Sequence, residues 1–195
     1  LQRIRQGESL PHDGGTVADP AAIDEFLDKL ATTEQFLEPN AGQKSFIRAV
    51  DRSLVPLHGP PGTGKTSGAT APALLGRAYA RARHNESFVG IVVAPSHEAV
   101  DAVLDGTTAF LDAWRQTESG LEQLQMVRVL PSTPPSPGDR VDDTTTAVDV
   151  TYANYNSQVG EETLQALADE LFSSNTAETA ASQQLLFTTP STLYR

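Results

Sequence analysis

The 195-residue sequence contains no cysteine, only three lysines and no long run of apolar residues. Without cysteine, the chain can form neither a disulfide bond nor a thiolate metal site. The longest apolar run, residues 88–94, is far shorter than the roughly 20 residues that span a bilayer, and no secretory signal precedes it. We therefore expect a cytoplasmic protein that makes no membrane contact. The four histidines lack metal-ligand spacing; they are His12, His58, His84 and His97.

Positive charge is also scarce, since the formal net charge is -11 and the isoelectric point is near 4.7. Such a surface repels nucleic acid as a whole, which argues against a simple basic binding module. If nucleic acid is the partner, backbone amides, hydroxyl groups and a few arginines must form the contact locally.

The length is sufficient for one substantial domain with its own core. The chain begins at Leu1 rather than Met and stops at Arg195 just after an apolar run, so we expect a fragment of a longer protein. Residues 1–39 are interpreted as a lead-in followed by a helix, and residues 40–195 as a truncated domain. A segment rich in Pro, Ser, Thr and Asp indicates an insertion at about 131–183.

Helical and strand-like patterns alternate along the rest of the chain. Asp19-Pro20 begins one amphipathic helix and a second begins near Ala41. The expected strands are 54–58, 88–94, 126–130 and 185–188, and the expected helices after them are 65–83, 96–114 and 161–172. This order predicts an α/β fold with a parallel sheet that has helices on both faces. The apolar run 88–94 is typical of a buried parallel strand.

The most specific motif lies between an expected strand and an expected helix, and it fits G-x-x-x-x-G-K-[ST]. Its residues are Gly59, Pro60, Pro61, Gly62, Thr63, Gly64, Lys65 and Thr66. Glycines let consecutive amides turn toward a phosphate, and the helix that follows adds its N-terminal amides. We expect Lys65 to meet the β- and γ-phosphates and the Thr66 hydroxyl to bind Mg²⁺. The motif predicts a nucleoside-triphosphate-binding P-loop protein.

Two prolines disturb the elements around this motif. Pro56 falls within the expected strand 54–58, where a central position would lose a ladder hydrogen bond. Pro72 falls within the following helix and should kink it or shift its hydrogen-bond register.

Three further segments resemble superfamily 1 DNA/RNA helicases, particularly the branch that includes the nonsense-mediated-decay helicase. Asn40-Ala41-Gly42-Gln43 matches the adenine-reading N-x-x-Q of that family. The resemblance implies a RecA-like first motor domain that binds ATP with Mg²⁺, with Gln43 on the adenine. A glutamine amide carries both a donor and an acceptor, which suits the N6 and N7 of adenine. The alternative for Gln43 is an ordinary surface residue on a helix.

The other two segments imply a track for single-stranded DNA or RNA. Residues 91–101 resemble the family's second strand and the motif after it, with His97 where asparagine is common, and residues 185–192 resemble a later strand that ends in threonines. The resemblance places Ser96, His97, Thr188 and Thr189 on the nucleic acid. Ser96 could equally be a helix cap, and strands often end in threonine. Arg128 lies on the intervening strand, where a structural role is expected.

The expected motor lacks two parts in this chain. No buried strand ends in an acidic pair for Mg²⁺, since Asp169 and Glu170 lie on the expected helix 161–172. The second motor domain that completes the cleft is missing as well, so the chain alone should be a weak or inactive ATPase. The alternatives are another P-loop ATPase, such as an AAA-type remodelling enzyme, and an inactive scaffold or binding module.

Overall fold

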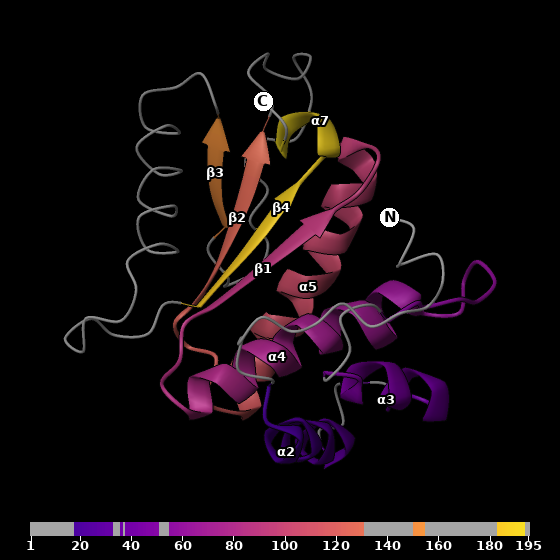
Figure 1. Ribbon diagram of the computed structural model, residues 1–195, viewed down its shortest axis with the longest axis vertical. Coiled ribbons are helices and arrows are strands. Elements are labelled where there is room, and N and C mark those ends of the chain that lie inside the picture. The colour runs from indigo at the N-terminus through magenta and orange to yellow at the C-terminus, as the bar shows by residue number, and fades with distance from the viewer. Residues whose placement is uncertain are drawn as a thin grey trace, which may run out of the picture.

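The computed structural model describes residues 18–32, 36, 38–50, 55–130, 150–154 and 183–193. Within these residues, parallel strands form one sheet in the order β1-β4-β2-β3. The strands are β1 (Phe88–Val93), β2 (Leu124–Leu130), β3 (Val150–Asn154) and β4 (Gln183–Thr188). The helices are α2 (Pro20–Thr32), α3 (Ala41–Arg48), α4 (Ala71–Arg83), α5 (His97–Thr117) and α7 (Pro190–Leu193), and a π-helix, η1 (Thr66–Thr70), precedes α4. In Figure 1, α4 and α5 lie along one side of the sheet, and α2 and α3 pack beyond α4. The fold is therefore α/β with an open parallel sheet, consistent with a P-loop domain.

Helices α2, α3 and α5 are amphipathic and carry side-chain caps at their N-termini. The carboxylate of Asp19 accepts a hydrogen bond from the amide of Ala21 at 2.9 Å, and Pro20 occupies the first helical position of α2. Four large apolar residues of α2 are buried: Ile23, Phe26, Leu27 and Leu30. The predicted helix is confirmed. None of the helices in the described part of the chain is long and apolar enough to cross a membrane.

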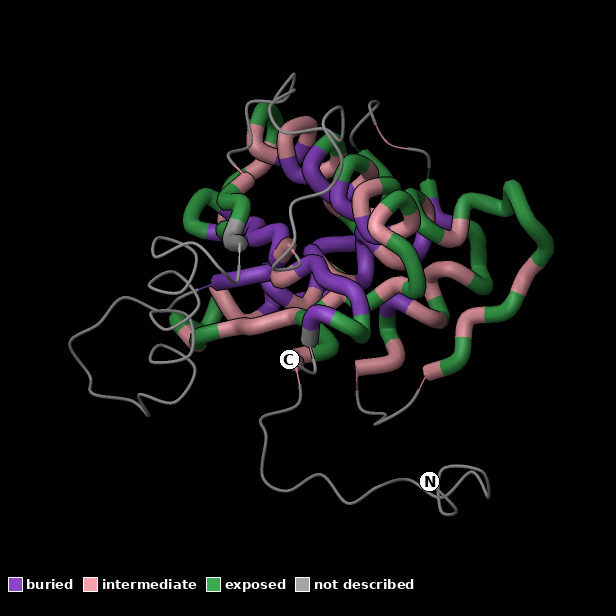
Figure 2. The backbone as a smooth tube through the Cα atoms, turned by 90° about the horizontal axis from the view of Figure 1, so that it is seen from above, coloured by how far each residue is buried: buried purple, intermediate pink, exposed green. Residues whose placement is uncertain are grey.

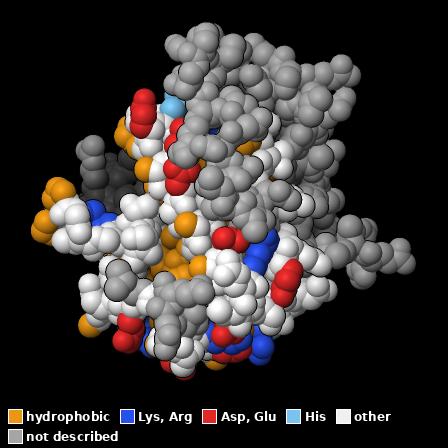
Figure 3. Space-filling view, turned by 180° about the vertical axis from the view of Figure 1, so that it is seen from behind, with side chains coloured by type: hydrophobic (Ala, Val, Ile, Leu, Met, Phe, Trp, Pro, Cys, Tyr) orange, Lys and Arg blue, Asp and Glu red, His pale blue; other side chains and the backbone are white. Residues whose placement is uncertain are grey.

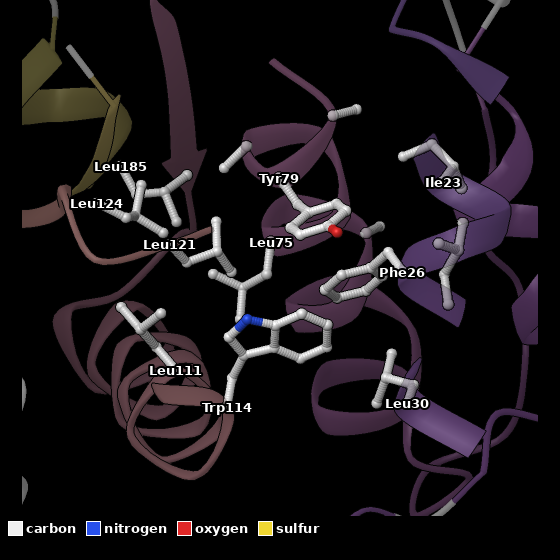
Figure 4. Packing of buried hydrophobic residues seen from close by; sticks show 14 of the residues in the cluster. Ile23, Phe26, Leu30, Leu75, Tyr79, Leu111, Trp114, Leu121, Leu124 and Leu185 are labelled. Carbon is white, nitrogen blue, oxygen red and sulfur yellow. The ribbon is translucent and has the colours of Figure 1, made fainter. Parts of the chain in front are cut away.

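The core contains residues of the sheet and of α2, α3, α4 and α5, and aromatic side chains join three of these helices to one another (Figure 4). The Trp114 ring on α5 stacks on Phe26 of α2 with 4.6 Å between centroids, and meets Tyr79 of α4 edge-on at 5.8 Å. Gly76 permits this approach, because an added Cβ would lie 3.1 Å from the Phe26 ring. The sheet supplies Leu124, Met126, Leu185 and Phe187 from one face. This packing fixes α4 and α5 against the strands.

The strand β1 differs from the buried strand that its sequence predicts. Among the described residues it pairs only with β4, and the side chains of Ile91 and Val93 are 52% and 45% exposed. Its other face carries Phe88 and Val92, which pack against the core. The tube in Figure 2 shows buried segments gathered at the centre and exposed ones around them. Within the described residues, a continuous apolar run thus lies at the edge of the sheet, because burial depends on neighbouring strands as well as on sequence.

Three other expectations need correction or fall outside the described residues. The expected strand 54–58 is wrong, because residues 55–58 have no regular structure, and Pro56 has no amide to donate to a ladder. The segment expected to be an insertion contains β3, where Val150, Thr151 and Tyr152 have strong β-propensity. The remainder of the insertion, the helix 161–172 with Asp169 and Glu170, Leu54 and the lead-in 1–17 lie outside the described residues.

The register shift that Pro72 predicts is confirmed. The amide of Ala71 donates to the carbonyl of Thr66, five residues earlier, and the helix is wound as a π-helix over Thr66–Thr70. Pro72 then falls in the first turn of α4, where a missing amide costs little. The π-helical turn begins at Thr66, the last residue of the phosphate-binding motif, and therefore shapes the site itself.

Candidate nucleotide-binding site

The glycine-rich motif forms an exposed loop between residues 58 and 65, immediately before η1. Gly62 and Gly64 adopt φ values of 78° and 70°, a region that only glycine enters without strain. The Thr63 hydroxyl donates to the Pro60 carbonyl at 2.8 Å and closes the loop upon itself. An added Cβ at Gly59 would lie 3.1 Å from that hydroxyl oxygen. The backbone thus has the freedom that a phosphate cradle requires.

Lys65 folds back over the loop that it follows. Its ammonium donates to the carbonyls of Gly59 at 2.8 Å and Pro60 at 2.5 Å. Both acceptors are backbone atoms of the loop, so the charge lies at the mouth of the cradle while the side chain is half-buried. A phosphate would offer oxygens of higher charge to the same ammonium. Thr66, the next residue, is exposed at the start of η1, where its hydroxyl is accessible to a cation.

Gln43 connects α3 to the loop. Asn40 and Gln43 form a reciprocal cap, in which the Gln43 amide donates to Asn40 Oδ1 at 3.0 Å and the Asn40 amide donates to Gln43 Oε1 at 2.8 Å. Gln43 Nε2 lies 3.4 Å from the carbonyls of both Thr63 and Gly64. Oε1 of the Gln43 side chain thus completes the cap of α3, and Nε2 is the end that contacts the loop.

Gly68 is the residue that makes this contact possible, and the motif alone did not point to it. A Cβ at Gly68 would lie 2.6 Å from Gln43 Nε2, so any larger residue would push the amide away. The sequence did offer one signal for this contact, a glycine within an expected helix two residues after Thr66. Glycine destabilises a helix, so its presence there indicates a close packing contact.

A cleft of about 870 Å³ separates α3 from the loop. Its size falls in the range of small-molecule sites, and it is lined by backbone and side chains of both polar and apolar character. Gln43, Gly59, Pro60, Thr63 and Lys65 from the predicted set all line it. Residues 55–58, which do not form the expected strand, complete one wall. The described residues hold no group of three or more His, Asp or Glu side chains suited to a metal ion.

A second cluster lies at the carboxyl end of the sheet, where β1 leads into α5. Ser96 caps α5 by accepting from the Ala99 amide at 3.2 Å, so the expected capping role is present. The Ala94 amide donates to the Thr188 carbonyl at 3.3 Å, which brings the ends of β1 and β4 together. The structure therefore gathers Ser96, His97, Thr188 and Thr189 at one edge. Ser96 is exposed and His97 half-buried, whereas Thr188 and Thr189 are only 1% and 3% exposed.

Arg128 is the buried centre of this cluster. Its guanidinium, on a side chain that is 1% exposed, donates to Asp101 Oδ1 at 2.7 Å and to the carbonyls of Val129 and Phe187. A fourth bond, of 2.9 Å, reaches His97 Nδ1. Arg128 thus has a structural role, as expected, because it ties α5 to β2 and β4.

An acidic residue already uses the first turn of α5. The backbone amide of Glu98 and the Ser96 hydroxyl hold the pKa of the Glu98 carboxyl below its ordinary value. This carboxylate is fully exposed and stands where an anionic ligand would approach the helix. In Figure 3, Lys and Arg side chains of the described residues form small separate groups beside acidic ones. The described residues therefore form no continuous basic surface on this face.

These features define a P-loop nucleotide-binding domain of the α/β class. Residues 38–191 match the family model described as AAA domain, AAA_11, which is most of the chain. The chain belongs to this family, and the match supports a helicase-like, P-loop AAA domain. No curated protein and no solved structure matches it.

Proposed function

We propose that this chain is the ATP-binding part of an ATP-dependent helicase or translocase that acts on single-stranded DNA or RNA. The observation that carries the proposal is the contact of Gln43 with the phosphate loop, because it holds the amide that we propose to read the base beside the cradle. The family match and the order of motifs along the chain support it. In this proposal the triphosphate lies on residues 59–66 and the base lies against α3.

The residues present fit a nucleotide with Mg²⁺. The loop glycines keep the space open, the Lys65 ammonium is already at the mouth of the cradle, and Thr66 is exposed beside it. The bound cation would supply charge neutralisation of the phosphates. Gln43 would then exchange its weak contacts with loop carbonyls for hydrogen bonds to adenine, which guanine cannot match.

The nucleic-acid strand is proposed to pass the carboxyl edge at Ser96 and His97. Both are accessible, and they stand at the N-terminus of a 21-residue helix, where amides favour phosphate. Thr188 and Thr189 support this edge from within, and a direct contact with the strand would require them to become accessible. We further propose that hydrolysis needs a second motor domain and acidic Mg²⁺ ligands supplied from elsewhere, so the chain alone turns ATP over slowly.

A calorimetric titration with Mg-ADP and with Mg-GDP, beside binding of fluorescent single-stranded oligo-dT and oligo-U, tests the proposal. We expect ADP to bind in preference to GDP, and an oligonucleotide to bind in a salt-sensitive manner. The second candidate is an AAA-type remodelling ATPase, which the family description equally covers. Nucleotide binding without any affinity for oligonucleotides would favour that candidate. If neither Mg-ADP nor Mg-GDP bound, the proposed nucleotide site would be wrong.

A further inference from the structure

The buried guanidinium of Arg128 contacts a ring nitrogen of His97, which is accessible at the carboxyl edge. Arg128 Nη2 and His97 Nδ1 are 2.9 Å apart. A guanidinium carries only N–H donors, so Nδ1 must be the acceptor in this pair. The ring proton of His97 is consequently on Nε2, because the hydrogen bond made by one ring nitrogen decides the tautomer of the other.

The surroundings of Arg128 hold it in one orientation. The side chain is 1% exposed, and its Nε and Nη1 groups donate to Asp101, to Val129 O and to Phe187 O. These partners belong to α5, β2 and β4, so the guanidinium cannot turn without breaking bonds to three elements. The direction of the Nη2–H bond toward His97 is therefore fixed by the fold rather than by the histidine.

A ligand at this edge would meet the opposite nitrogen of the ring. His97 Nε2 has no hydrogen-bond partner among the described residues, and the side chain is half-buried beside the exposed Ser96. An N–H group in a fixed orientation, next to the first amides of α5, is suited to a phosphate oxygen. With the ring proton on Nδ1 instead, the same edge would present an acceptor, which repels phosphate.

We propose that Arg128 is a positioning residue that fixes His97 in the Nε2–H tautomer, so that His97 donates a hydrogen bond to a backbone phosphate of single-stranded nucleic acid. The donor role of His97 rests on the proposed function, whereas the positioning role of Arg128 does not. Arg128 itself stays buried and does not touch the strand. Asp101 holds the guanidinium from the solvent side, with a side chain that is 48% exposed.

The tautomer is measured directly by long-range proton–nitrogen NMR of the ¹⁵N-labelled chain, with the His97 ring assigned from the His97→Gln spectrum. We expect an unprotonated Nδ1 and a protonated Nε2 at neutral pH. Arg128→Lys lacks the guanidinium that reaches His97 and Asp101 together, so both tautomers of His97 should be populated in this variant. An Nδ1–H tautomer in the parent chain overturns the proposal, and this measurement holds even if Arg128→Lys fails to fold.

Binding of single-stranded oligo-dT at fixed salt concentration tests whether His97 donates a hydrogen bond to the strand. His97→Ala should lower the affinity about tenfold, as expected for one hydrogen bond to a charged group. His97→Gln, whose amide N–H can reach the position of Nε2, should recover part of that loss. Addition of oligo-dT should shift the Nε2 signal of the parent chain more than the Nδ1 signal.

These measurements distinguish the positioning role of Arg128 from the donor role of His97. A fixed Nε2–H tautomer in a chain that binds no oligonucleotide would sink the proposed nucleic-acid function, and with it the donor role, while leaving the positioning by Arg128 in place. Binding that is unchanged in His97→Ala would overturn the donor role alone. A tautomer that is the same in a folded Arg128→Lys variant would overturn the positioning role.

Discussion

The phosphate loop and the Arg128 cluster are built in opposite ways. The loop is exposed, spans eight consecutive residues and makes its bonds with itself and with Gln43. The Arg128 cluster is centred on a buried cation whose partners lie 27, 31 and 59 residues away in the chain. A local motif can therefore be recognised from composition and spacing, whereas a cluster made by tertiary contacts depends on the sheet that assembles it.

The largest expected effect comes from the loop, because its function depends on one ammonium. Lys65→Ala should lower the affinity for Mg-ADP by about 100-fold, through loss of the charge-assisted bonds to phosphate. The melting temperature should change little, since the Lys65 bonds in the structure are to exposed loop carbonyls. Isothermal calorimetry and thermal unfolding measure the two quantities.

Lys44→Ala is the matched control for this experiment. Lys44 is on α3, next to Gln43, but its ammonium is paired with Glu38 on the surface. We expect its affinity for Mg-ADP to match that of the parent chain. If both lysine variants lost affinity equally, general charge rather than the loop would be responsible for binding.

The second effect concerns Gln43, which belongs to both the local motif and the tertiary structure. Gln43→Ala should lower the ratio of ADP to GDP affinity about tenfold, the discrimination that a bidentate amide contact provides. Binding of phosphate should weaken less, because Lys65 and the loop glycines remain. Titrations of both nucleotides decide the matter, and an equal loss for the two would contradict a role in base selection.

Particular residues show where sequence reasoning succeeded and where it failed. The motif at 59–66, the helix from Pro20 and the register shift at Pro72 follow from φ preferences, capping and a missing amide, which are local properties. The strand expected at 54–58 was wrong, and there Pro56 removes a ladder donor. The burial expected for residues 88–94 was wrong because it depends on which strands lie alongside. Likewise, no spacing rule predicts that Gly68 faces Gln43 or that Arg128 reaches His97.

A smaller effect is expected from the glycine under Gln43. Gly68→Ala would place a Cβ 2.6 Å from Gln43 Nε2, and since that atom ends a flexible side chain, the amide should move rather than the helix. We expect the affinity for ADP to fall about fivefold, through displacement of the Gln43 amide from the base.

Gly106→Ala provides the matched substitution, because it is also a glycine within a helix. Its Cβ would meet only the Thr66 methyl at 3.8 Å, an ordinary contact. This variant should keep its affinity for ADP and gain about 0.5–1 kcal/mol of unfolding free energy from helix propensity. Urea unfolding and calorimetry on the two variants show whether Gly68 acts through Gln43. Equal behaviour of the two would exclude that role.

The smallest effect lies at the carboxyl edge, where Glu98 competes with an anionic ligand for the start of α5. Glu98→Gln should raise the affinity for oligo-dT about two- to threefold, since it removes one exposed charge near the strand. Asp112→Asn, a neutralisation near the other end of the same helix, should change the affinity less.

The pH dependence of this difference follows from the direction of the Glu98 pKa shift. Because folding lowers the carboxyl pKa below 4.5, Glu98 stays charged at neutral pH and its contribution to stability is lost only as the pH falls through the lowered value. The difference in oligo-dT affinity between the parent chain and Glu98→Gln should thus be constant between about pH 8 and pH 5 and disappear below pH 4.5. Fluorescence anisotropy at constant ionic strength measures it. A difference that persisted well below pH 4.5 would show that the Glu98 charge is not its cause.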